Sequence, residues 1–209
     1  MSVTLIIIVV TVGLSLMANN NSELYAKMLF NPYQVIHRKE WHRIITHAFV
    51  HDKGNIFHLI FNMYVLYSFG SVVESFLEQT VGSLASLLYL FIYFGGVIAA
   101  TVPSIIKHKD DYGYNSVGAS GAVSAILFSA IAFMPLQGGI GIIFIPISLP
   151  PIVFGVLYIA YEMYMDKRGG TNVAHDAHIG GAAFGFLFTL LFIPNVLSNF
   201  FNQLLAYFN

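Results

Sequence analysis

Six long apolar stretches run along the chain, separated by shorter polar segments. They cover roughly residues 3–17, 55–76, 84–102, 117–134, 151–165 and 174–196. A helix needs about 20 residues to cross about 30 Å of hydrocarbon, so each stretch approaches the length of one crossing. The pattern predicts an all-α, polytopic membrane protein built as a six-helix bundle, with residues 1–209 forming a single domain.

The first and fifth stretches need separate arguments. No Lys or Arg precedes the first, and residues 17–20 make a poor signal-peptidase site, so we expect a retained span. In the fifth, apolar sequence already begins at Ile140, but Pro146, Pro150 and Pro151 forbid one continuous helix. We therefore expect a helix from Pro151, preceded by an irregular or strand-like segment over residues 139–149.

Two polar segments are too apolar to be simple tethers. Residues 18–54 carry aromatic side chains and histidines among their charges, which predicts a structured first loop packed on the membrane face. In residues 197–209, Phe, Leu and Tyr alternate with Asn and Gln. This composition is typical of a segment that lies in the membrane interface.

Composition supports a lipid environment and excludes several kinds of function. The chain is 57% hydrophobic and only 9% charged, which leaves too few polar side chains to cover a soluble protein. Its formal net charge of −1 gives no basic surface for nucleic acid. There is no cysteine, so disulfides, thiol nucleophiles and thiolate metal sites are excluded.

Four polar side chains are expected to meet near one membrane face. Counting crossings, the second, fourth and sixth spans all begin on the face that holds the first loop. His58, Asn62, Ser120 and His178 lie near those starts, at similar shallow depth. Polar groups inside a membrane are costly and usually functional, so these four form the candidate site.

Ser120 and His178 have the surroundings that a nucleophile and its base require. Ser120 lies between small residues in the stretch 118–121, although a glycine-flanked serine by itself is more often a packing residue. His178 is followed by Gly181 and Gly185, a spacing that permits close helix contact. A neutral imidazole in that position can take the serine proton.

The remaining catalytic groups follow from the same reasoning. Asp176, Glu74 and Glu162 were each considered as an acidic partner of His178; the first falls on another helix face, and the others at the ends or middles of other spans. The sequence therefore predicts a Ser–His dyad. His58 and Asn62, one helical turn apart, are the expected oxyanion donors, with the backbone N–H of Ser120 as a third.

These motifs together resemble the rhomboid family of intramembrane serine proteases, over nearly the whole chain. Residues 118–121 match GxSG, residues 177–185 match AHxxGxxxG, and residues 58–62 match HxxxN. Residues 41–43 resemble the WxR of the first loop, and Phe69-Gly70 with Glu74 resembles the end of the second span.

The resemblance implies a serine endopeptidase that cleaves transmembrane segments of membrane-protein substrates. Ser120 is then the nucleophile and His178 the base, while His58 and Asn62 donate to the oxyanion. The remaining motif residues would be structural: Trp41, Arg43, Gly118, Gly121, Gly181 and Gly185. No metal and no cofactor are implied, the expected partners are transmembrane substrates and the lipid bilayer, and the oligomeric state stays open.

One position departs from the family pattern. Many members place an aromatic residue four positions after the nucleophile, where it packs on the catalytic imidazole, but this chain has Ser124. The support of the His178 ring must then come from an aromatic residue elsewhere. The fifth span, poor in close-packing glycines, is the expected side of substrate access, and it carries bulky side chains such as Phe154, Leu157 and Tyr161.

Charge and family resemblance disagree on orientation. All nine Lys and Arg residues fall on the face of the candidate site, which positive-inside reasoning would place in the cytoplasm. Rhomboid active sites open in the opposite direction. We follow the resemblance and expect a bacterial inner (plasma) membrane protein whose site opens to the outer face.

Two alternative functions remain open. His47 with His51, and His175 with His178, have spacings that suit a metal site, so a His-rich metal transporter is one alternative. However, no HExxH motif is present. A non-catalytic rhomboid-like protein that binds membrane clients is the other, although such relatives characteristically lack the serine or the histidine.

Overall fold

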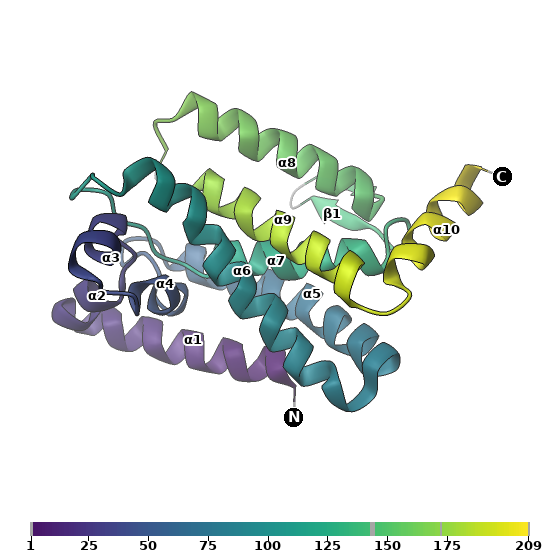
Figure 1. Cartoon of the computed structure of the whole chain (residues 1–209), viewed down its shortest axis with the longest axis horizontal. Coiled ribbons are helices and arrows are strands. Elements are labelled where there is room, and N and C mark those ends of the chain that lie inside the picture. The colour runs from purple at the N-terminus through teal and green to yellow at the C-terminus, as the bar shows by residue number, and fades with distance from the viewer. Residues whose placement is uncertain (1, 143–144, 172, 209) are drawn as a thin grey trace.

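The computed structural model describes residues 2–142, 145–171 and 173–208, and it is almost entirely helical (Figure 1). The all-α fold class is therefore confirmed. The elements, in chain order, are α1 (Val3–Asn20), α2 (Ser22–Met28), α3 (Pro32–Arg38), α4 (Arg43–Thr46), the 3-10 turn η1 (His47–Phe49), α5 (Ile56–Val81), the 3-10 turn η2 (Gly82–Leu84), α6 (Ala85–His108), α7 (Ser120–Phe133), β1 (Ile140–Ile142), β2 (Ile145–Leu149), α8 (Pro151–Arg168), α9 (His175–Phe192) and α10 (Val196–Phe208).

Helix α7 forms the centre of the bundle. Every residue from Gly121 to Phe133 is buried, and α5, α6 and α9 pack around the helix. Its 14 residues reach only about 21 Å at about 1.5 Å per residue, about two thirds of the hydrocarbon thickness. Ser120, its first residue, therefore begins a helix that is shorter than a full crossing.

Helix α1 is fastened to α5 by a carboxylate. The two oxygens of Glu74 accept from the Ser2 hydroxyl, at 2.6 Å, and from the backbone N–H of Val3. A negative side chain at a helix N-terminus pairs with unsatisfied N–H groups and with the helix dipole. This contact gives Glu74 a structural partner away from the candidate site.

Length and hydropathy identify fewer crossings than six among the described residues. Helix α1 and the stretch Ile56–His108, which contains α5 and α6, are long and apolar enough. Helices α9 and α10 qualify only as a pair bent by 100°, and α7 is apolar but short. The six-span count stays a prediction.

The boundaries of the later elements refine the sequence pattern. Helix α8 begins at Pro151, as expected, and β1 pairs antiparallel with β2 in the segment before it. Residues 143–144 of that segment lie outside the described residues. Helix α9 ends at Phe192 rather than 196, because Pro194 cannot continue the helix, and the chain turns into α10.

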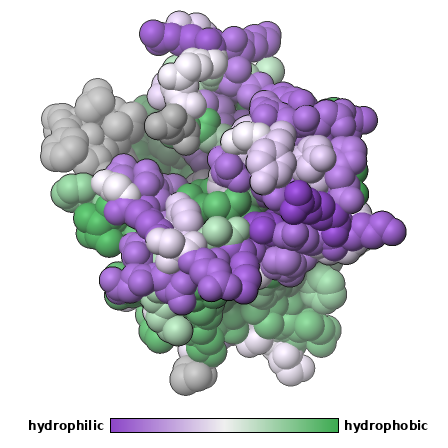
Figure 2. Space-filling view, turned by 90° about the vertical axis from the view of Figure 1, so that its left-hand side faces the viewer, coloured by the Kyte–Doolittle hydropathy of each residue, from purple (hydrophilic) through white to green (hydrophobic). Residues whose placement is uncertain are grey.

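One end of the bundle gathers the first loop and the starts of α5, α7 and α9 (Figure 1). The first loop is structured, as predicted, and folds into α2, α3, α4 and η1. Figure 2 looks onto this end and shows a mostly hydrophilic surface, with hydrophobic side chains on the flanks below it. Water therefore reaches this end, while the flanks suit lipid.

Candidate functional site

The first loop holds the backbone that precedes Ser120. Gly118 has φ of +118°, a conformation that side chains other than glycine rarely adopt. Its N–H donates to the carbonyl of His47 at 3.0 Å, and the N–H of Ala119 donates to Nε2 of His51 at 3.3 Å. These bonds fix where α7 starts and therefore where Ser120 lies.

The hydrogen bonds of His51 define its tautomer. Because Ala119 can only donate to Nε2, the ring proton is on Nδ1, which donates to the hydroxyl oxygen of Ser15 at 3.0 Å. The Ser15 hydroxyl in turn donates to the carbonyl of Phe49 at 2.9 Å. Burial lowers the pKa of His51 to about 3 and that of neighbouring His47 to about 4. Both rings are therefore neutral near pH 7.

Helices α7 and α9 touch backbone to backbone beside Ser120 and His178. A Cβ on Gly181 would stand 2.0 Å from the carbonyl oxygen of Gly121, and one on Gly185 would stand 2.0 Å from that of Ala125. Only glycine permits this approach. Ser120 directly precedes Gly121, and His178 lies three residues before Gly181. Both residues are therefore close to the first of these two contacts.

Ser120 and His178 are not hydrogen-bonded to each other in this structure. Among the described residues, the hydroxyl of Ser120 has no hydrogen-bond partner, and the ring of His178 is engaged through Nδ1 alone. In enzymes without substrate such contacts are often long and shorten only in the complex. The structure thus brings the two helices together, with Nε2 of His178 unoccupied.

The ring of His178 is hydrogen-bonded to an acidic side chain, a contact that the sequence did not predict. Oε1 of Glu162, on α8, lies 3.0 Å from Nδ1 of His178, and Oε2 accepts from Nδ1 of His175. The sequence gives no sign of this contact, because Glu162 belongs to another apolar stretch. The C-terminal part of α8, which carries Glu162, lies beside the start of α9.

An aromatic ring from α8 also supports His178. The ring of Tyr158 lies beside that of His178, with centroids 6.4 Å apart and planes inclined by 26°. The hydroxyl groups of Tyr158 and Ser124 are hydrogen-bonded at 2.9 Å. The aromatic support that Ser124 cannot give therefore comes from Tyr158. Tyr158 and Glu162 are four residues apart, on one face of α8.

The two expected oxyanion donors lie on α5, and His58 is next to the loop before Ser120. Cε1 of His58 is 2.8 Å from the point where a Cβ on Gly118 would stand, and its ring meets that of His51 edge-on at 5.2 Å. Asn62 is buried and its amide nitrogen donates to the carbonyl of His58 at 2.8 Å. One N–H of that amide is therefore engaged within the helix.

The two first-loop motif residues have different surroundings. Arg43 is buried, and its Nη1 donates to the carbonyls of Ala26 and Leu29, each at 2.7 Å, while Nε pairs with Glu40 at 2.7 Å. Trp41 is 56% exposed. The guanidinium thus links α2 to α4, whereas the indole lies at the surface.

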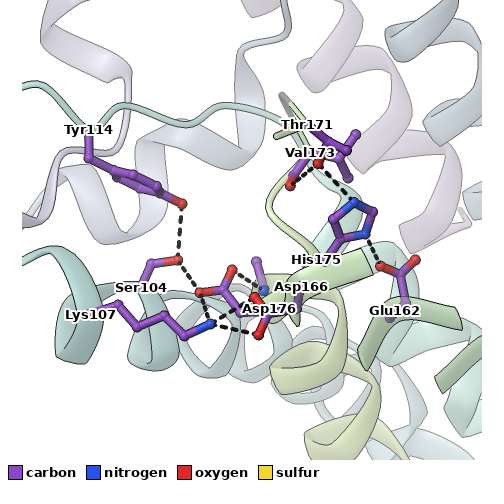
Figure 3. Close-up of polar contacts among 10 residues, drawn as sticks. Ser104, Lys107, Tyr114, Glu162, Asp166, Thr171, Val173, His175 and Asp176 are labelled. Carbon is purple, nitrogen blue, oxygen red and sulfur yellow. Dashed lines mark hydrogen bonds and ion pairs between the residues drawn. The ribbon is translucent and has the colours of Figure 1, made fainter. Parts of the chain in front are cut away.

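A second polar network adjoins the site (Figure 3). Lys107 on α6 pairs with Asp166 on α8 at 2.7 Å and with Asp176 on α9 at 3.4 Å. Asp176 also accepts from the hydroxyl of Ser104, at 3.2 Å. These contacts link the ends of α6 and α8 to the start of α9. In the same view, the ring of His175 points toward Glu162 and away from Lys107.

Glu162, His175 and His178 have the composition of a metal site. One ligand atom from each lies within 4.8 Å of the other two, which matches the three protein ligands of a catalytic zinc centre. Yet each ring nitrogen that faces the carboxylate is already hydrogen-bonded to it. The three groups therefore satisfy one another without an ion.

Comparisons with known proteins agree on a family. The family model described as Rhomboid domain matches residues 38–195. RHOMBOID-like protein 12, mitochondrial, of Arabidopsis thaliana is 30% identical over 68% of this chain and 44% of its own length. The Presenilin-associated rhomboid-like protein, mitochondrial, of Bos taurus is 31% identical over 63% of this chain and 33% of its own length. Rhomboid-like protein 15 of Arabidopsis thaliana is 28% identical over 80% of this chain and 40% of its own length.

Proposed function

The chain belongs to the rhomboid family of membrane proteins, and from this premise we propose that it is an intramembrane serine endopeptidase that cleaves transmembrane segments of other membrane proteins. The observation that carries the proposal is the meeting of α7 and α9 at Gly121 and Gly181. Ser120 precedes Gly121, and His178 lies three residues before Gly181, with its ring in contact with Glu162 and Tyr158; this arrangement supports the proposal.

Ser120 is the nucleophile of this reaction and His178 is its general base. Because Nδ1 of His178 faces Glu162, Nε2 remains to accept the serine proton. The serine oxygen bonds to the substrate carbonyl carbon, the peptide C–N bond breaks, and His178 returns the proton to the leaving amine. Water then gives a proton to His178 and attacks the acyl carbon. The ester bond to Ser120 breaks, and His178 returns the proton to the serine oxygen.

The oxyanion that forms during the attack needs donors at the start of α7. The backbone N–H of Ser120 is available because the first N–H groups of a helix have no partner within it. The ring of His58, against Gly118, and the second N–H of the Asn62 amide are the further donors. Each such donor contributes about 3–4 kcal/mol of transition-state stabilisation.

Helix α8 is the side from which a substrate helix reaches the site. Only Pro151, Gly155 and Glu162 of this helix are buried, whereas Val156, Leu157, Tyr161 and Tyr164 are exposed. Most of the surface of α8 is therefore open to lipid or to a substrate helix, while the contacts of Glu162 with α9 hold its C-terminal part in place. The substrate unwinds at helix-breaking residues, and water from the hydrophilic end completes hydrolysis.

The protein is an integral membrane protein, and its particular membrane is part of the proposal. The mitochondrial names among its relatives give no support to a bacterial inner membrane. The chain spans less than half the length of these relatives. The proposal is therefore limited to orientation: the hydrophilic end, which carries Ser120, faces away from the compartment that holds the N-terminus.

A cleavage assay in liposomes tests the proposal. A model single-span substrate is expected to be cut by the wild type, while Ser120→Ala and His178→Ala lose cleavage by at least about 1,000-fold. Ser129→Ala is the matched control, because Ser129 lies on the same helix but bonds Thr189. Cleavage retained by Ser120→Ala would overturn the nucleophile, and a wild type that binds without cutting would support the non-catalytic alternative.

A metal-dependent function is separated by the same assay. The cluster of Glu162, His175 and His178 is the one observation that favours it. We expect cleavage to persist in excess chelator, because the serine mechanism uses no ion. Loss of cleavage on chelation, restored by Zn²⁺, would instead support a metal centre.

A further inference from the structure

Glu162 is a costly residue for its position. It is 4% exposed and interrupts the apolar sequence of a helix whose outward side chains suit lipid. A buried carboxylate is destabilising unless it is paired and hydrogen-bonded. Its hydrogen-bond partners among the described residues are the rings of His175 and His178, so its placement serves those two rings.

Each carboxylate oxygen faces one ring nitrogen of the same kind. Oε1 lies 3.0 Å from Nδ1 of His178, and Oε2 faces Nδ1 of His175, whose other nitrogen lies 3.0 Å from the hydroxyl of Thr171. A carboxylate only accepts, so both rings donate from Nδ1. This fixes the tautomer of His178 and turns its Nε2 lone pair away from α8.

Tyr158 restricts the same ring in a second direction. Its aromatic ring lies along the face of the imidazole, while Glu162 contacts the edge at Nδ1. These two contacts restrict the rotation of the ring about its side-chain bonds. Both supports come from α8, one turn apart.

We propose that Glu162 is a positioning residue that completes a Ser120–His178–Glu162 triad, with His175 holding the second carboxylate oxygen in place. The proposal rests on the proposed function. When Ser120 transfers its proton to Nε2, the imidazolium forms beside a negative charge at 3.0 Å. The carboxylate stabilises that cation and therefore the transition state, without taking the proton itself.

Glu162→Gln tests this role with almost no change in shape. The amide removes the negative charge, whichever way it faces, and can offer an N–H where a ring nitrogen also carries a proton. We expect kcat in the liposome assay to fall by at least about 100-fold with KM changed less than about threefold. Glu162→Asp keeps the charge but reaches only one ring. Its kcat is expected to lie between that of the wild type and that of Glu162→Gln.

Asp166→Asn is the matched control. Asp166 lies one turn further along α8, and its carboxylate pairs with Lys107 rather than with a ring. We expect its kcat to stay within about twofold of the wild type. Thermal unfolding of all three variants, with midpoints compared in detergent, separates a loss of folding from a loss of catalysis.

Histidine ¹⁵N spectra give a readout that does not need activity. In the Ser120→Ala protein, the resonance that disappears in Ser120→Ala/His178→Asn is assigned to His178. We expect a protonated Nδ1 and an unprotonated Nε2. A proton on Nε2 instead, or a kcat of Glu162→Gln within about twofold of the wild type, would overturn the role of Glu162 alone. A wild type that cleaves nothing would overturn the proposed function itself.

Discussion

His51 shows how a single buried side chain connects the first loop to the start of α7 at Ser120. Its neutral ring accepts from Ala119, the residue before Ser120, and donates to Ser15 on α1. A proton added to Nε2 would face the Ala119 N–H and break that bond. The start of α7 therefore depends on the protonation state of a residue far away in the sequence.

This dependence predicts a loss of stability in acid. The folded pKa of His51, about 3 because of burial, lies below its unfolded value of about 6.5. The unfolded chain thus binds the extra proton between these values, so stability rises with pH there and is lost as pH falls below about 6.5. His47 acts in the same direction. For each pH unit by which the pH falls in this range, each such group lowers the free energy of unfolding by up to roughly 1.4 kcal/mol.

Thermal unfolding in detergent between pH 7 and 5 measures this effect. The midpoint is expected to fall with pH, and His51→Gln is expected to reduce the slope. His37→Gln is the control, because His37 is an exposed side chain on α3. An unchanged slope in His51→Gln would show that His51 is already protonated in the folded protein or is not buried.

At the scale of single residues, the sequence predicted that Ser120, His178 and His58 lie near helix starts, and they lie near the starts of α7, α9 and α5. The contact of Glu162 with His178 was not predicted, because Glu162 lies within another span and the sequence does not show which side of that helix meets the site. An acidic residue inside an apolar span was the available signal. Tyr158 required the rotation of α8, which sequence does not give.

The contact between α7 and α9 is the element-level feature on which the site depends. Two glycines of α9 face backbone atoms of α7 at Gly121 and Ala125, and each contact fixes the separation of the helices. Because Ser120 and His178 lie within one turn of the first contact, a small displacement there moves both. Packing at this crossing therefore controls the relative position of Ser120 and His178.

Gly181→Ala is predicted to reduce both stability and activity. The new methyl group would meet the carbonyl oxygen of Gly121 at 2.0 Å, so the helices must separate. Such overpacking costs about 1–3 kcal/mol, and a shift of about 1 Å between reacting groups costs about 100-fold in rate. Thermal unfolding and the liposome assay measure the two effects.

Gly13→Ala is the control for this substitution. Gly13 lies on α1, with open space where its Cβ would stand, so cleavage is expected to be unchanged. Equal activity in Gly181→Ala and Gly13→Ala would mean that the close helix crossing is not needed for catalysis.

The start of α8 was predictable because Pro151 sets it. The end of α9 was placed too late because the apolar sequence continues past Pro194 into α10, and hydropathy alone does not show a bend of 100°. The pairing of β1 with β2 fits the strand-like segment expected before α8. Its register, with Gly141 opposite Ser148, depends on hydrogen bonds that no apolar pattern encodes.

For the whole molecule, the open question is which end of the bundle faces which compartment. The hydrophilic end seen in Figure 2 carries the first loop and the candidate site. The chain has no cysteine, so a single introduced thiol reports its own location without interference. Asp111 is exposed in the loop between α6 and α7, and Gln79 is exposed near the far end of α5.

Asp111→Cys and Gln79→Cys are predicted to react with a membrane-impermeant maleimide from opposite sides of sealed vesicles. The reason is that α5 and α6 together place these positions at opposite ends of the bundle. We expect Asp111→Cys to react on the side away from the N-terminus. Labelling of both positions from the same side would contradict the membrane arrangement.

The lipid environment followed directly from hydropathy, but the direction of the protein in the membrane did not. Positive charges gather on the face of the site, because several stabilise the structured loop and its neighbours, as Arg43 and Lys107 do. Charges with such structural partners are poor indicators of topology. This is a physical reason for the conflict between the charge pattern and the family resemblance.

The central claim is that Ser120 is a nucleophile activated by His178. Labelling the protein in its own membranes with a fluorophosphonate, followed by mass mapping of the modified residue, tests it most directly. We predict phosphonylation of Ser120 that is lost in His178→Ala and kept in Ser129→Ala. Modification of another serine, or equal labelling of Ser120 in His178→Ala, would contradict the claim.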